Sequence, residues 1–150
     1  MVEDARVRTK DWIDTYYTPA NATDDDGNAL GMQCMFANPD YPLSLEFKHP
    51  SVIDVIITVD KPRSTPLPGH DQAVTHYREH VPIQIMSVNK TGVTAVKAVW
   101  QAEAEIRRIG ETYPSGSLRV LESVRDFTRD LGSTRVEGSE YTLNYVRDTT

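Results

Sequence analysis

The stretch that decides the fold is residues 91–110, TGVTAVKAVWQAEAEIRRIG. A stripe of apolar side chains recurs there at the spacing of one helix face, widened by Val96 and Trp100, and it consists of Ala95, Val99, Ala102, Ile106 and Ile109. Glu103 and Arg107 have the spacing of an exposed ion pair on a helix. The sequence therefore predicts one long central helix with a single face turned toward the core.

Two β-branched runs precede this helix. Residues 52–59, VIDVIITV, are nearly all apolar, which is typical of a strand buried on both faces. Residues 74–88 place Val81, Ile83 and Ile85 on one side and predict a second long strand. Pro82 lies inside that run and favours an edge strand or a bulge, because proline cannot donate a backbone hydrogen bond.

The remaining patterns complete the expected fold. Residues 2–17 have helical spacing up to Pro19, and residues 32–36, 43–48 and 141–146 each predict a strand. Residues 118–131 are ambiguous, because Val120, Val124, Phe127 and Leu131 also have helical spacing; we favour a strand through about Arg125 followed by a loop. We expect an α+β fold in a single domain of residues 1–150. Its mostly antiparallel sheet of about four to five strands carries an N-terminal helix and the central helix.

Composition narrows the class of protein. A chain of 150 residues fits one domain, and its net charge of −6 argues against DNA or an anionic membrane as the main partner. Cys34 is the only cysteine, so an intramolecular disulfide is impossible, and its apolar neighbours predict a buried thiol. The chain shows neither a signal-peptide core nor an apolar run of membrane-spanning length. We expect a protein made in a cytoplasm with no membrane partner.

One group of side chains has the residue types of a metal site: His70, Asp71, His76 and His80. On a helix, His76 and His80 would lie one turn apart and could share a metal ion. On a strand, four residues span roughly 13 Å, which is too far for two direct ligands at about 2 Å each. Pro82 and the alternation favour the strand. A metal-binding protein or metal-dependent enzyme that uses these four residues is the alternative function.

Other signals for chemistry are weak. In the Asp24–Gly27 stretch, the EF-hand frame places Ala22 and Gln33 where ligands are needed, so we interpret it as a solvated acidic turn. The sequence has no Gly-x-Ser-x-Gly nucleophile elbow, no glycine-rich phosphate loop and no dinucleotide fingerprint. A small molecule held between the helix stripe and the sheet is a third possibility, although no residue pattern marks a pocket. We predict a non-enzymatic protein without a cofactor.

The order of segments resembles a known family. The residues that carry the likeness are 52–61, 77–90, 91–109 with the run WQAEAEIRRI, 117–119, and 140–147, EYTLNYVR. This order resembles the tail-completion (tail terminator) proteins of long-tailed bacterial and archaeal viruses. The resemblance implies a sheet with helices on one face and a ring, commonly hexameric, at the head-proximal end of the tail tube. Such a ring stops tube growth and presents a surface to the head-side connector, without catalysis or cofactor.

The resemblance also implies partners and a contact surface. The partners would be other copies of the chain in a ring, the tail tube protein and the head–tail connector, with DNA only passing through the lumen of a virion assembled in the host cytoplasm. Residues 62–69, PRSTPLPG, predict an extended loop rather than regular structure. A loop of this kind is a natural subunit contact, so the expected interface residues are Pro62, Arg63, Pro66, Leu67, Pro68, His70 and Arg78. An acidic lumen would let DNA slide without sticking.

Overall fold

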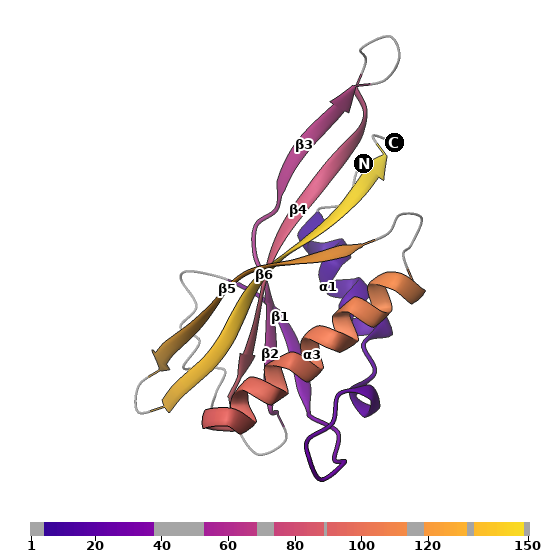
Figure 1. Ribbon diagram of the computed structural model, residues 1–150. Helices are drawn as coiled ribbons and strands as arrows, with labels where there is room; N and C mark the ends of the chain where they lie inside the picture. Colours follow the sequence, from indigo (N-terminus) through magenta and orange to yellow (C-terminus); the bar gives the residue numbers. More distant parts are fainter. Residues whose placement is uncertain are drawn as a thin grey trace.

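The computed structural model describes residues 5–37, 53–68, 74–88, 90–113, 119–131 and 134–148. The predicted strand at 43–48 lies outside these ranges. Figure 1 shows the elements, which are α1 (Ala5–Tyr16), a short 3₁₀ turn (Pro19–Asn21), β1 (Met32–Phe36), β2 (Val55–Val59), β3 (Arg63–Pro68), β4 (Val74–Ser87), α3 (Gly92–Thr112), β5 (Val120–Leu131) and β6 (Thr134–Asp148).

All six strands belong to one sheet. Its order is β1-β2-β4-β6-β5, and β3 also pairs with β4. The β1–β2 pair is parallel, whereas the other pairs are antiparallel. The α+β class and the mostly antiparallel sheet are therefore confirmed, but the sheet is larger than the four to five strands expected from the sequence.

Strand β4 is central rather than an edge strand, so that prediction from Pro82 was wrong. β2 pairs with residues 83–87 of β4, and β3 pairs along the same side of β4 with residues 74–80. Pro82 lies at the junction between these two partners, where its carbonyl oxygen accepts a hydrogen bond from the Asp60 amide at 2.9 Å. Its ring nitrogen faces the same side, because both backbone groups of a strand residue point one way. At this break between strands the missing donor leaves no gap in a ladder.

The proline-rich stretch is a strand and not the loop that its composition predicted. β3 pairs from Arg63↔His80 to Pro68↔Val74, with a register shift between Leu67 and Pro68. In the described part of the sheet β3 has a partner on one side only. Proline is tolerated in such an edge strand because its nitrogen can face the open side. The register shift leaves its extra residue, Thr75, on β4 and not on β3.

Strand β5 is longer than the sequence predicted. It continues as a strand to Leu131, where a loop was expected after about Arg125, because it forms a long antiparallel hairpin with β6. A bulge between Ser123 and Arg125 interrupts the register and left the alternation hard to read from the sequence. In β6, the predicted alternation of Tyr141, Leu143 and Tyr145 is confirmed, since all three are buried.

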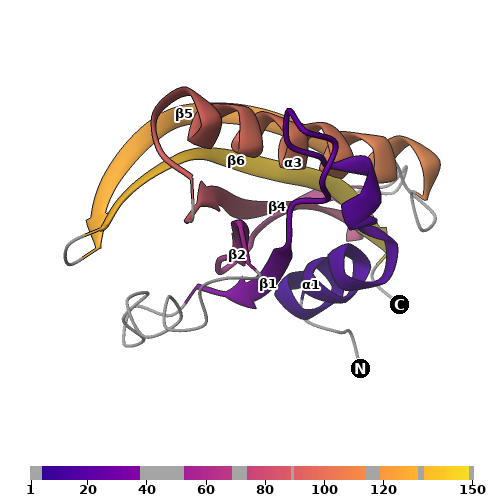
Figure 2. The ribbon, with the colours of Figure 1, turned by 90° about the horizontal axis from the view of Figure 1, so that it is seen from below.

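The main core lies on the face of the sheet that carries both helices. The five residues of the predicted stripe on α3 are all buried. Four of them, Val99, Ala102, Ile106 and Ile109, belong to one cluster with residues of α1, β2, β4 and β6. Figure 2 shows that the sheet curves, from β5 and β6 beside α3 to β1 and β2 beside α1. All five residues of β2 are buried, as the sequence predicted, because a smaller cluster around Ile56 and Met86 covers the opposite face.

Helix α1 is fastened by an aromatic and cationic contact. The Trp12 indole nitrogen donates to the carbonyl oxygen of Tyr113 at 2.7 Å. The Arg119 guanidinium lies 4.9 Å from the Trp12 ring centroid and 4.4 Å from that of Tyr145. Cation–π contacts strengthen when water is excluded, and Arg119 is only 4% exposed. This contact joins α1, the end of α3 and the last strand.

Candidate functional site

The predicted interface residues that the structure describes lie on or beside a projecting arm. We define the arm as β3 with residues 74–80 of β4, and Figure 1 shows it rising away from both helices. Pro62 precedes it. His70 lies outside the described residues. The remaining predicted residues are on the arm, where Arg63, Pro66, Pro68 and Arg78 are exposed and Leu67 is half-buried.

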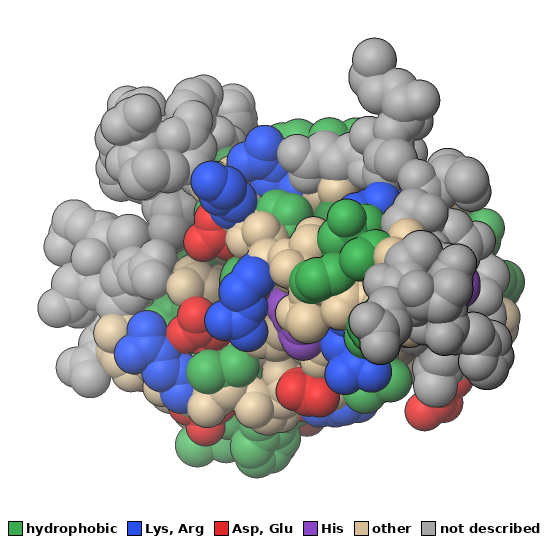
Figure 3. All heavy atoms as spheres, turned by 90° about the horizontal axis from the view of Figure 1, so that it is seen from above, with side chains coloured by type: hydrophobic (Ala, Val, Ile, Leu, Met, Phe, Trp, Pro, Cys, Tyr) green, Lys and Arg blue, Asp and Glu red, His purple; other side chains and the backbone are tan. Residues whose placement is uncertain are grey.

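The register assigns these side chains to faces of the arm. Arg63 is opposite His80, and Leu67 is opposite His76. Since paired residues share a face and alternate residues along β4 do so too, Arg63, Leu67 and Arg78 lie on one face with both histidines. In the view from above, Lys or Arg side chains adjoin a histidine side chain (Figure 3).

The two described histidines lie on a strand, as the alternation predicted. His80 is held by two neighbours: its Nδ1 is 2.6 Å from Oδ1 of Asn144, and its Nε2 is 3.3 Å from Oγ1 of Thr65. Asp71, like His70, lies outside the described residues. Within the part of the chain that the structure describes, no three His, Cys, Asp or Glu side chains are grouped to hold a metal ion. The described residues therefore add no support for the metal alternative.

A buried ion pair fixes the base of the arm. Glu79 is 1% exposed, and its carboxylate accepts from Nε of Arg147 at 2.5 Å and from Oγ of Ser64 at 2.5 Å. The Arg147 guanidinium also lies 4.9 Å from the Tyr77 ring centroid. These contacts join β3, β4 and β6, so side-chain interactions hold the arm in place as an extension of the sheet. The sequence analysis missed this pair, which the register Glu79↔Tyr145 brings together.

A second exposed region lies at the other end of the sheet. Among the described strands, β5 ends the sheet order and has β6 as its only partner. Val124 on this strand is 56% exposed, and Trp100 on α3 is 58% exposed. The sequence prediction that Trp100 widens the buried stripe was therefore wrong. Its neighbours Val99 and Ala102 point into the core, and one helix residue corresponds to a turn of about 100°.

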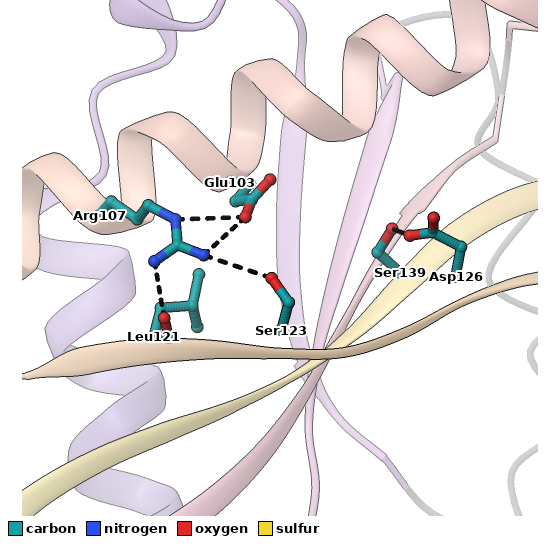
Figure 4. A network of polar contacts seen from close by, with 6 residues as sticks. All are labelled: Glu103, Arg107, Leu121, Ser123, Asp126 and Ser139. Carbon is teal, nitrogen blue, oxygen red and sulfur yellow. Dashed lines mark hydrogen bonds and ion pairs between the residues drawn. The ribbon is translucent and has the colours of Figure 1, made fainter.

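Polar contacts connect α3 to this edge strand. Arg107 donates to the Glu103 carboxylate at 2.8 Å, which confirms the predicted pair, and to the carbonyl oxygen of Leu121 at 2.6 Å. The Ser139 hydroxyl donates to Oδ1 of Asp126 at 2.6 Å. Figure 4 shows Glu103 and Arg107 on the helix above β5, with the Asp126–Ser139 contact farther along the sheet. The Arg107 contacts join α3 to β5, and the Asp126–Ser139 contact joins β5 to β6.

The acidic turn has the form expected of a solvated turn. Oδ1 of Asp24 accepts from the backbone amides of Asp26 and Asn28, each at 2.9 Å, and Gly27 has a φ of 83° that favours glycine. The hydrogen bond from the Asn28 amide is the main cause that lowers the Asp24 pKa. The Asp25 carboxylate lies 3.1 Å from Nζ of Lys97 on α3. The Asp24 carboxylate thus orders the turn, and the Asp25–Lys97 pair joins the turn to α3.

Cys34 is buried, as its apolar neighbours predicted. Burial raises the pKa of its thiol to about 12, so the reactive thiolate form is scarce at neutral pH. This residue is a core side chain and not a nucleophile.

No family model and no curated protein matches this chain. Neither helix that the structure describes combines the length and apolar character needed to cross a membrane. The functional argument therefore depends on the two exposed regions themselves.

Proposed function

We propose that this chain is a structural virion protein that forms a ring at the head-proximal end of a viral tail tube. The ring would terminate the tube and join it to the head-side connector. Its partners would be further copies of the chain, commonly six in all, the tail tube protein and the connector protein. DNA would only pass through the lumen. The proposed function is structural and involves no catalysis.

One observation carries the proposal. The arm and the β5 edge beside Trp100 are different surfaces at opposite ends of one sheet (Figure 1). A protein that closes into a ring needs two different surfaces, because each copy must contact one neighbour with its front and the other with its back. Open strand edges and exposed aromatic side chains are features that natural sheets otherwise avoid or cover.

The buried contacts supply the stiffness that assembly needs. The Glu79–Arg147 pair fixes the arm at its base, and the Arg107 contacts fix the β5 edge against α3. Preformed surfaces lose less conformational entropy on association than flexible ones. Both surfaces are thus preformed in a single copy.

The native mass in solution, measured by light scattering together with negative-stain images of the same sample, tests this function. We expect a closed ring with a central hole. A strictly monomeric chain that also fails to bind the open end of isolated tail tubes from its own virus would contradict the proposal.

A further inference from the structure

The outer part of the arm carries apolar side chains without a core to bury them. Pro66 and Pro68 are exposed, Leu67 is half-buried, and Val74, which pairs with Pro68, is 42% exposed. Figure 1 shows this part of the arm well away from α1 and α3. An extended Pro-Leu-Pro segment is a rigid ligand, because proline has little conformational freedom left to lose on binding.

A groove of matching character lies at the opposite end of the molecule. Two adjoining hollows of about 250 Å³ and about 270 Å³ share Trp100, Asp126 and Ser139 in their walls. We call them together the Trp100 groove; its apolar lining includes Val96, Val99 and Val124. Aromatic-lined grooves are the usual receptors for extended proline-containing segments, which pack their flat rings on the aromatic face.

The charges of the arm and the groove are complementary. Arg63 and Arg78 of the arm are exposed, and neither forms an ion pair with a carboxylate among the described residues. The charged lining of the groove is mainly acidic, with Glu103, Asp126, Glu137 and Glu140 against Arg125. Two of these carboxylates are already in ion pairs, Glu103 with Arg107 and Glu140 with Arg125, and Glu137 accepts a hydrogen bond from Thr128. The Asp126 carboxylate has only the Ser139 hydroxyl as a described partner. Complementary charge orients two surfaces and speeds their encounter.

We propose that the outer part of the arm of one copy inserts into the Trp100 groove of the next copy. A single copy cannot make this contact with itself, because the two surfaces lie at opposite ends of its sheet. The contact is heterologous and generates a ring when the rotation between neighbours closes. This inference rests on the proposed ring and identifies the contact that builds it.

Two variants that each lose one side of the contact test this inference. Leu67→Asp disables the arm, and Trp100→Glu disables the groove, and both replace side chains outside the core. Each variant alone should be a folded monomer, with pairwise affinity about thirtyfold weaker or more, because buried Trp and Leu anchors dominate such interfaces. In a mixture, the Trp100→Glu variant still has an intact arm and the Leu67→Asp variant still has an intact groove. The two should therefore form a dimer of one copy each and no ring.

Matched substitutions serve as controls. Lys61→Asp places an acid just before the arm, and Val93→Glu places one on α3 at a side chain that is 72% exposed and outside the groove. Both controls should assemble like the wild type. Rings that persist in Leu67→Asp and Trp100→Glu, or a mixture that stays monomeric, would overturn the insertion and leave the ring proposal standing. A wild-type chain that never assembles would overturn the ring proposal as well.

Discussion

Strand β4 passes through two regions that differ in almost every physical property. In residues 81–87 it is flanked by β2 and β6, and Val81, Ile83 and Ile85 are fully buried against the helix-bearing side. In residues 74–80 it belongs to the arm, where the side chains of Val74, His76 and Arg78 are exposed. Among the arm residues of β4 whose burial is described, only Glu79 is buried. The helix-covered half is a core that stabilises the fold. The arm contributes little core, and we propose that it serves a contact with another copy of the chain.

This difference predicts which substitutions reduce stability most. Ile106→Ala, in the helix-covered half, should lower the free energy of unfolding by about 2–5 kcal/mol, because it leaves a cavity where Ile106 is fully buried. Urea denaturation measures this loss. Val93→Ala on the same helix should change stability by less than about 0.5 kcal/mol. Equal effects of the two substitutions would mean that α3 does not pack as described.

The arm should have one sensitive position, at its base. Glu79→Ala leaves the largely buried Arg147 without its carboxylate and should cost about 2–3 kcal/mol, less than for a fully buried pair because Arg147 is partly solvated. Thermal unfolding measures the loss. The double change Glu79→Leu with Arg147→Met removes both charges and should recover most of it. A harmless Glu79→Ala would show that the arm is not fixed by this pair.

A pH-dependent contribution should come from the helix-covered half. Glu105 is buried, and although desolvation raises its pKa, hydrogen bonds from Arg108 and the Thr18 amide lower it below the usual 4.5. A lowered folded-state pKa stabilises the fold above the unfolded value, and the gain is lost as pH falls through the folded-state pKa. The stability difference between wild type and Glu105→Gln should therefore shrink below about pH 4.5. A difference that is constant with pH would contradict this role.

The smallest effect on stability should come from the outer part of the arm. Pro68→Ala removes an exposed ring and should change the free energy of unfolding by less than about 0.5 kcal/mol. The same substitution should weaken assembly, because it removes part of the apolar segment proposed to enter the groove. Light scattering against concentration, beside urea denaturation, separates the two effects. A large loss of stability with normal assembly would show that the outer part of the arm stabilises the fold and does not serve assembly.

The sequence predicted the helix-covered half well because its signals are local. The stripe on α3 and the alternation in β6 each reveal one buried face, the run in β2 reveals two, and all three are buried as expected. Each pattern arises because one element packs against a core, and the spacing of its apolar residues indicates which face is buried.

The arm could not be predicted in the same way because its order comes from pairing partners. Pro66 and Pro68 indicate a loop locally, yet an edge strand tolerates them, and Pro82 fits a central strand only because β2 gives way to β3 beside it. Helical spacing alone assigned Trp100 to the core. Its side chain is exposed because the elements that pack against α3 do not cover that part of the helix. The candidate site was therefore half anticipated: the arm residues were named, and the groove was not.

Cross-linking tests the central claim most directly. A chain with Pro68→Cys and Val124→Cys places one thiol on the arm and one in the Trp100 groove, and the buried Cys34 should not compete. Under mild oxidation the claim predicts a ladder of disulfide-linked copies that ends at the ring, and no ladder for Pro68→Cys with Val93→Cys. A chain that assembles normally but stays unlinked, with both new thiols free, would contradict the claim.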